Sequence, residues 1–200
     1  MIPSLSNQNY LKMICEKIKS KRTIRLFRQD KIDYRILERC IDAARSSSSA
    51  RNSQPLEYII IDDKELLDDL IPLIHFGGFI SDDKNAVKGL EPTALIVVVV
   101  RKGFEEYCKY DIGIAAQNIS LVAYENNIGT CMMGLIDKDK IKEKLSVPDD
   151  YYVDLVIALG YPAEQPVAEE TGSDTAYYRK DEVLHVPKRK LKDVLHRNGF

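Results

Sequence analysis

Two almost continuously apolar stretches constrain the fold more than any other feature of the sequence. They are Thr93–Arg101 (TALIVVVVR) and Tyr152–Leu159 (YVDLVIAL). Successive side chains of a β-strand point to opposite faces, so a strand that is apolar on both faces must be covered on both sides. Helical patterns separate these strands along the chain. We therefore expect a three-layer sandwich of the α/β or α+β class.

The remaining periodicity predicts the surrounding elements. Apolar residues at helical spacing predict helices over residues 7–20, 33–45, 64–71, 107–127 and 137–145. Residues 57–62 are predicted to form a strand and 129–134 a strand or a turn, whereas 75–92 show no periodicity and are expected to be a loop. We interpret residues 1–200 as a single domain. Residues 161–200, polar at first and basic at the end, are predicted to be an extended arm that buries its apolar residues against a second subunit.

Charge and cysteine usage exclude several classes of protein. Lys and Arg total 29 against 31 Asp and Glu, and this balance lacks the sustained basic surface of a nucleic-acid binder. The four cysteines form no Cys-x-x-Cys pair, so we expect no metal site and interpret them as reduced, small buried apolar groups. The N-terminus has no secretory pattern, and no apolar run reaches the ~20 residues that span a bilayer. A cytoplasmic protein without a membrane or nucleic-acid partner is the expectation.

Five polar clusters could carry chemistry, and the first is Lys21–Phe27 (KRTIRLF). If this stretch is extended, Lys21, Thr23 and Arg25 project to one side while Ile24 points inward. Two cations beside a hydroxyl suit a phosphate or a polarised carbonyl. A solvated basic turn explains the same residues and stays open as the alternative.

The other four clusters are also ambiguous when each is considered alone. Ser48–Pro55 offers amide groups to the edge of a heteroaromatic ligand, or is a turn. Asp111–Asn118 places Gln117 and Asn118 in an apolar helix, where buried amides would need partners. Gly129–Gly134 would let backbone N–H groups approach a flat ligand. Lys188–Lys190 is a second anion site or a solvated basic segment.

Taken together and in order, these clusters resemble the motifs of the flavin-dependent nitroreductase family. That family carries [RK]-R-[ST]-x-R-x-F near its N-terminus, matched by Lys21–Phe27. Its S-x-x-N-x-Q-P loop is matched by Ser49–Pro55, and its D-x-G-x-A-x-Q-N helix by Asp111–Asn118. A strand ending in L-G-Y-P (Leu159–Pro162) and a basic run near the C-terminus complete the resemblance, which covers roughly residues 8–198.

The resemblance implies an α+β fold, a mixed or antiparallel sheet flanked by helices, and a homodimer with FMN at the interface and C-terminal arms that cross to the partner. Lys21, Arg22, Thr23 and Arg25 would hold the flavin phosphate and pyrimidine edge, and Lys188 and Lys190 would return to the phosphate. The isoalloxazine, of the other subunit, would be approached by Ser49, Ala50, Arg51 and Asn52. Met133 and Gly134 would present backbone near the reactive nitrogen of the flavin.

The function that follows from the resemblance is a ping-pong oxidoreductase. NAD(P)H would reduce FMN and be replaced by a nitro compound, quinone or related small-molecule acceptor, and no side-chain acid, base or metal is required. The sequence departs from the family at Lys21, where Arg is commoner, at Leu56, where Trp is usual, and at the bulky Arg51. The departures at Leu56 and Arg51 leave open a flavin-binding protein without turnover, such as a sensor or flavin carrier.

Overall fold

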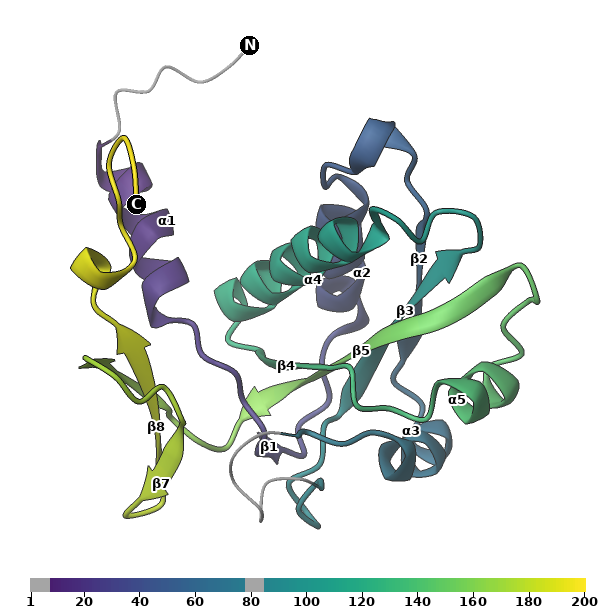
Figure 1. Cartoon of the computed structure of the whole chain (residues 1–200). Helices are drawn as coiled ribbons and strands as arrows, with labels where there is room; N and C mark the ends of the chain where they lie inside the picture. The colour runs from purple at the N-terminus through teal and green to yellow at the C-terminus, as the bar shows by residue number, and fades with distance from the viewer. Residues whose placement is uncertain (1–7, 78–84) are drawn as a thin grey trace.

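A five-stranded antiparallel sheet lies at the centre of the molecule (Figure 1). The computed structural model describes residues 8–77 and 85–200, with side chains from residue 14 onward. The two apolar stretches are β3 (Ala94–Arg101) and β5 (Tyr151–Pro162), which pair antiparallel. β2 (Leu56–Ile61) borders β3, and β4 (Gly129–Met133) and β1 (Phe27–Arg28) divide the other edge of β5 between them.

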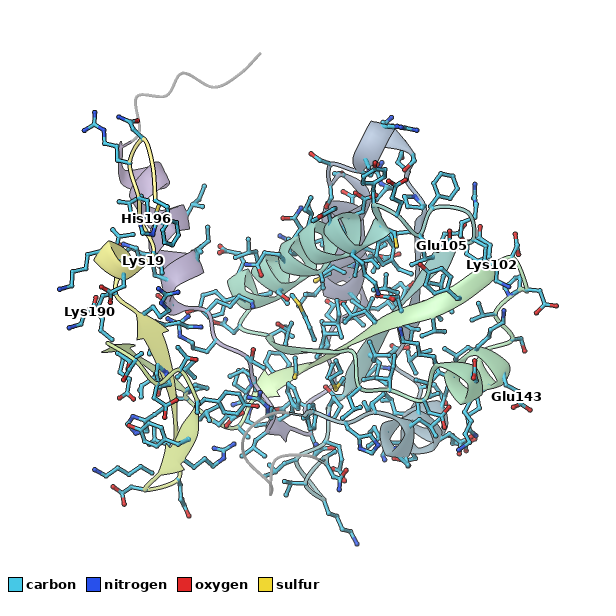
Figure 2. The ribbon with its side chains drawn as sticks, viewed as in Figure 1. Lys19, Lys102, Glu105, Glu143, Lys190 and His196 are labelled. Carbon is cyan, nitrogen blue, oxygen red and sulfur yellow. The ribbon has the colours of Figure 1, made fainter. Side chains whose placement is uncertain are left out.

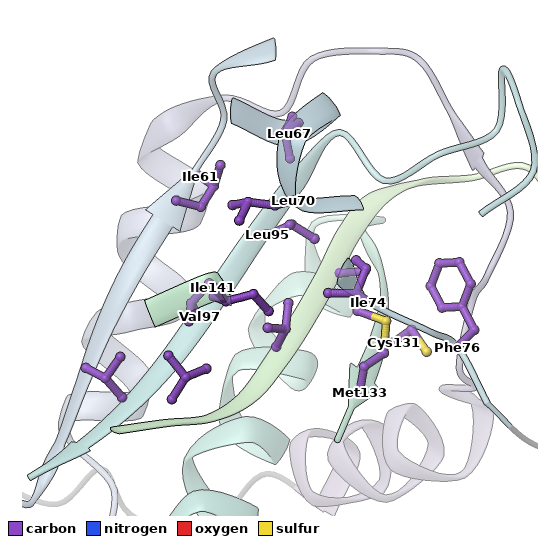
Figure 3. Close-up of a cluster of buried hydrophobic side chains, with 14 of the residues drawn as sticks. Ile61, Leu67, Leu70, Ile74, Phe76, Leu95, Val97, Cys131, Met133 and Ile141 are labelled. Atoms are coloured by element: carbon purple, nitrogen blue, oxygen red, sulfur yellow. The ribbon is translucent and has the colours of Figure 1, made fainter. Parts of the chain in front are cut away.

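Alternate residues of β3 enter two separate hydrophobic clusters, as its sequence predicts. Leu95, Val97 and Val99 pack with α3 (Lys64–Leu70) and α5 (Lys138–Lys144), in the cluster drawn in Figure 3. Ala94, Ile96, Val98 and Val100 pack on the other face with α2 (Tyr34–Arg45) and α4 (Cys108–Glu125). These three layers confirm the sandwich, and the antiparallel pairing selects the α+β alternative.

Aspartates begin three of the helices and fix their positions. The side chains of Asp33, Asp63 and Asp137 accept backbone hydrogen bonds at the starts of α2, α3 and α5. Each supplies an acceptor to a backbone N–H that has no partner within its own helix. The predicted helices over 33–45, 64–71 and 137–145 are therefore confirmed to within a residue or two. The loop expected over 75–92 is neither helix nor strand in its described parts, and 78–84 lie outside the described residues.

One charged residue interrupts the buried strand β5 and is accommodated by a bulge. The pairing register with β3 shifts between Val98 and Val99, which leaves Asp154 without an opposite residue. Its buried carboxylate accepts hydrogen bonds from Lys109 of α4 and Lys138 of α5, the latter at 3.3 Å. A buried carboxylate needs such partners, because an uncompensated charge in the interior is costly.

The C-terminal arm contains a small sheet that the sequence analysis did not predict. β6 (Val167–Thr171) runs parallel to β8 (Val183–Arg189), and β7 (Tyr178–Lys180) pairs with β8 antiparallel. Only Leu184 and Pro187 are buried in these strands, so no apolar alternation marks them. In Figure 1 the arm lies on the same side of the molecule as α1 (Gln8–Ser20). Short 3₁₀ turns occur at Ala50–Asn52, Ile71–Leu73 and Leu191–Asp193.

The cysteine interpretation holds for three residues and is wrong for the fourth. All four are free, and Cys40, Cys108 and Cys131 are buried, whereas Cys15 is exposed on α1. Burial raises the pKa of the Cys40 and Cys131 thiols to about 11, so both stay protonated near neutral pH.

Within 8–77 and 85–200, no helix is long and apolar enough to cross a membrane. The same residues contain no cluster of three or more metal-ligating side chains.

Candidate functional site

The segment Lys21–Arg25, here called the cationic segment, leaves α1 and runs along the edge of β4. Thr23 forms a parallel bridge with Thr130, and the Ile24 N–H donates to the Thr130 carbonyl at 3.0 Å. Ile24 points inward, as its alternation predicts, and packs on Gly129. A Cβ on Gly129 would lie 2.6 Å from Ile24 Cγ1, so glycine is required there for this close approach.

Cations from both ends of the chain line one cavity beside this segment. The cavity has a volume of about 350 Å³, and Lys21, Arg22, Thr23 and Arg25 face it together with Lys188 from β8. Its other walls are Ile18, Gln117, Tyr177 and Val186. The sequence interpretation placed these five polar residues in one anion site, and the fold brings them together within a single chain.

Two of the residues that line the cavity are arginines of the cationic segment. Arg25 is only 8% exposed, and its guanidinium carbon lies 4.7 Å from the centroid of the Tyr177 ring. The Nε atoms of Arg22 and Arg25 are buried and have no hydrogen-bond partner among the described residues. Buried donors normally find acceptors, and leaving one unpaired costs about 1–3 kcal/mol. The cationic side chains of the lining therefore suit an anionic ligand with several oxygen acceptors.

The surroundings of Lys21 also favour an anion in the cavity. Burial, together with the positive charge of Arg22, lowers the pKa of Lys21 below its ordinary value of 10.5. A lowered pKa means that the charged ammonium form of Lys21 is disfavoured at this position. An anion in the cavity would oppose both effects, because it supplies the charge that the cationic segment lacks.

The Ser49–Asn52 loop, the second predicted cluster, is held in place by α4. Asp111, 3% exposed, accepts a hydrogen bond from the Ala50 N–H at 2.9 Å, and Asn118 donates to Ser47 Oγ at 2.7 Å. The amide of Asn118 thus has the partner that its position demands, whereas Gln117 is exposed toward the cavity. Within the loop, Arg51 and Asn52 have φ values of 56° and 53°, and Gln54, two residues after it, has a φ of 47°. Such left-handed residues are costly, and they gather where function requires a particular backbone.

Seven predicted site residues do not line the cationic cavity of this chain. Ser49 lines a separate cavity of about 390 Å³ that is also bordered by Leu56, Tyr58 and Asp111. Ala50, Arg51 and Asn52 make the neighbouring turn, and the last two are exposed. Met133 is buried in the cluster of Figure 3, and Gly134 follows it with open space around it. Lys190 precedes the last 3₁₀ turn and lies at the outer side of the arm in Figure 2.

Comparison with known proteins identifies the family and the fold of the chain. The profile of the Nitroreductase family matches residues 18–161. The FMN-dependent nitroreductase of Clostridium difficile R20291 superimposes with a TM-score of 0.68 and 25% identity, over 92% of this chain and 98% of that one. A nitroreductase family protein from Clostridium novyi NT gives a TM-score of 0.64 and 29% identity, over 74% of this chain and 86% of that one.

A sequence relative comes from Methanothermobacter thermautotrophicus and carries the provisional name NADH dehydrogenase/NAD(P)H nitroreductase. It is 29% identical over 161 residues, which are 76% of this chain and 79% of the relative. The chain belongs to the nitroreductase family. Membership supports oxidoreductase chemistry in general.

Two polar residues of the cavity lining were absent from the set of residues predicted to hold the cofactor. Gln117 lies in the Asp111–Asn118 motif, so the sequence marked it as a polar residue in an apolar helix. The sequence did not show that it lines the cavity. Tyr177 lies in a polar stretch with no periodicity, and nothing in the sequence marks it as a neighbour of Arg25.

Proposed function

We propose that the chain is an FMN-dependent oxidoreductase that takes hydride from NADH or NADPH and reduces nitroaromatics, quinones or related acceptors. The observation that carries this proposal is the cationic cavity, where Lys188 of β8 joins the cations of the cationic segment. The name of the C. difficile neighbour supports the flavin, and that of the archaeal relative supports the nicotinamide donor.

The donor set fits the phosphate and the polar edge of FMN. Lys21, Arg22 and Lys188 would neutralise the phosphate, and the Thr23 hydroxyl would donate to one of its oxygens. Arg25, stacked against Tyr177, would place a fixed positive charge beside the pyrimidine edge. When bound, FMN supplies the hydride chemistry, and the protein contributes binding, orientation and exclusion of water.

We further propose that a second copy of the chain completes the site. The Ser49–Asn52 loop and the Met133–Gly134 backbone lie outside the cavity lining, and the loop's Arg51 and Asn52 face outward. Large apolar side chains are exposed on α4 and on the arm, including Tyr110 at 72% and Leu191 at 69%. Burying them in a homodimer, with the arm of each chain crossing to its partner, would remove this apolar surface from water.

Absorbance and turnover measurements test this function together. Purified protein, supplied with FMN and separated from the excess, should retain a flavin spectrum that NADH or NADPH bleaches anaerobically and a nitroaromatic or quinone restores. Arg25→Ala should lose flavin, whereas Lys64→Ala, an exposed cation on α3, should not. Retained flavin without nicotinamide-driven turnover would select the carrier or sensor alternative. Protein that retains no flavin would contradict both.

A further inference from the structure

Glu164, just beyond β5, holds three segments of the chain with one carboxylate. Its Oε1 accepts hydrogen bonds from the backbone N–H groups of Arg25 at 2.6 Å and Leu26 at 3.2 Å. Its Oε2 accepts from Arg179 Nη2 of β7 at 2.8 Å. The side chain of Glu164 is only 5% exposed. The carboxylate therefore joins the cationic segment, the end of β5 and the small sheet of the arm.

This contact differs in kind from the surface ion pairs of the molecule. A surface pair such as Lys64–Asp68 contributes little, because water screens both charges. A buried carboxylate must be satisfied on both oxygens, and breaking one side leaves an uncompensated charge. Glu164 is satisfied on one side by the main-chain N–H groups of Arg25 and Leu26 and on the other by Arg179 of the arm.

Arg25, one partner of Glu164, lines the cationic cavity, whereas Arg179 belongs to the arm, which contributes Tyr177 and Lys188 to the lining. Tyr177, on which the Arg25 guanidinium stacks, lies two residues before Arg179. Lys188 follows in β8, which pairs with β7 through Arg179 and Leu184. The carboxylate thus fixes the backbone from which Arg25 extends and the sheet that delivers Lys188.

We propose that Glu164 is a positioning residue that sets the geometry of the cationic cavity and couples it to the order of the arm. The part of this proposal that concerns FMN binding rests on the proposed function. The coupling between the cationic segment and the arm does not, because it can be measured on the chain without flavin. Removing the carboxylate should loosen both the cationic segment and the arm, whereas removing Arg179 should loosen only the arm.

Hydrogen exchange on the full chain without flavin measures the coupling directly. Glu164→Ala should speed exchange at the amides of Arg25 and Leu26 and across β7 and β8. Arg179→Ala should speed exchange in β7 and β8 and leave the Arg25 and Leu26 amides protected. Glu164→Gln keeps one acceptor oxygen and should retain much of that protection, and Asp68→Ala on α3 is the matched surface control. Unchanged exchange at Arg25 and Leu26 in Glu164→Ala would overturn the proposal.

FMN affinity then separates positioning from a merely structural role. Glu164→Ala should weaken FMN binding by roughly 10-fold or more, because a misplaced charged donor forfeits its bond to the ligand. In a background that carries both Arg25→Ala and Lys188→Ala the same change should cost about 2-fold or less, since coupled residues are non-additive. Effects that multiply in the triple variant would refute positioning through Arg25 and Lys188. Wild-type protein that binds no FMN would instead refute the proposed function, and the exchange experiment would still decide the role of Glu164.

Discussion

Substitution of Gly129 by alanine tests how the cationic segment is seated against β4. A Cβ at this position would lie 2.6 Å from Cγ1, 2.7 Å from Cβ and 2.9 Å from Cγ2 of Ile24. Ile24 Cβ is bonded to the backbone, so rotation of the side chain cannot relieve the clash. Either β4 or the cationic segment has to move, and overpacking of this kind costs about 1–3 kcal/mol.

The expected change in Tm follows from this cost. In a domain of this size 1 kcal/mol corresponds to roughly 2–4 °C, so Gly129→Ala should lower Tm by roughly 2–12 °C at a fixed protein concentration. It should also weaken FMN binding, because the displaced segment carries Arg22 and Arg25. Gly172→Ala is the matched control, since its Cβ would meet nothing within 4 Å. Equal Tm values for the two variants would refute the close packing of Ile24 on Gly129.

Three further changes probe the electrostatics and packing of the site. Because the pKa of Lys21 is lower in the folded chain, the unfolded chain binds more protons between that lowered pKa and 10.5, so the free energy of unfolding should rise with pH across that window. Urea unfolding at several pH values should show a smaller rise in the free energy of unfolding for Lys21→Met than for the wild type. An identical dependence on pH in the two proteins would contradict this prediction. Asp111→Ala should cost about 1–3 kcal/mol in urea unfolding, because the Ala50 N–H loses its acceptor. A smaller loss in Asp111→Asn is expected, and equal losses would argue against the hydrogen bond. Leu56→Trp should fold with a Tm close to wild type, because the 390 Å³ cavity beside Leu56 has room for the indole, and a large fall in Tm would show that this space is not available.

The central layers could be predicted because β3 and most of β5 are apolar on both faces. In β3, alternate residues from Ala94 to Val100 enter opposite clusters, so the pattern alone required cover on both faces. The small sheet of the arm could not be found in this way. Its strands bury little beyond Leu184 and are held by pairing with one another, and such pairing leaves no local signal.

The residues of the candidate site could be predicted in part from the sequence, but the contacts between them could not. The approach of Lys188 to Arg25 followed from the family resemblance, since no local pattern specifies contacts between opposite ends of a chain. Glu164 lies in a polar stretch after a strand, and only the fold shows that it accepts from the Arg25 amide. The Ser49–Asn52 loop lies outside the cavity lining, so its proposed role depends on a second copy of the chain.

The central claim is that cations from both ends of the chain hold the phosphate of FMN. Calorimetric titration with FMN and with riboflavin, which lacks the phosphate, tests it most directly. We expect FMN to bind at least about 10-fold more tightly, as charge-assisted contacts to a phosphate require, and this preference to shrink in Lys188→Ala. Equal affinities of the wild-type protein for the two flavins would contradict the account.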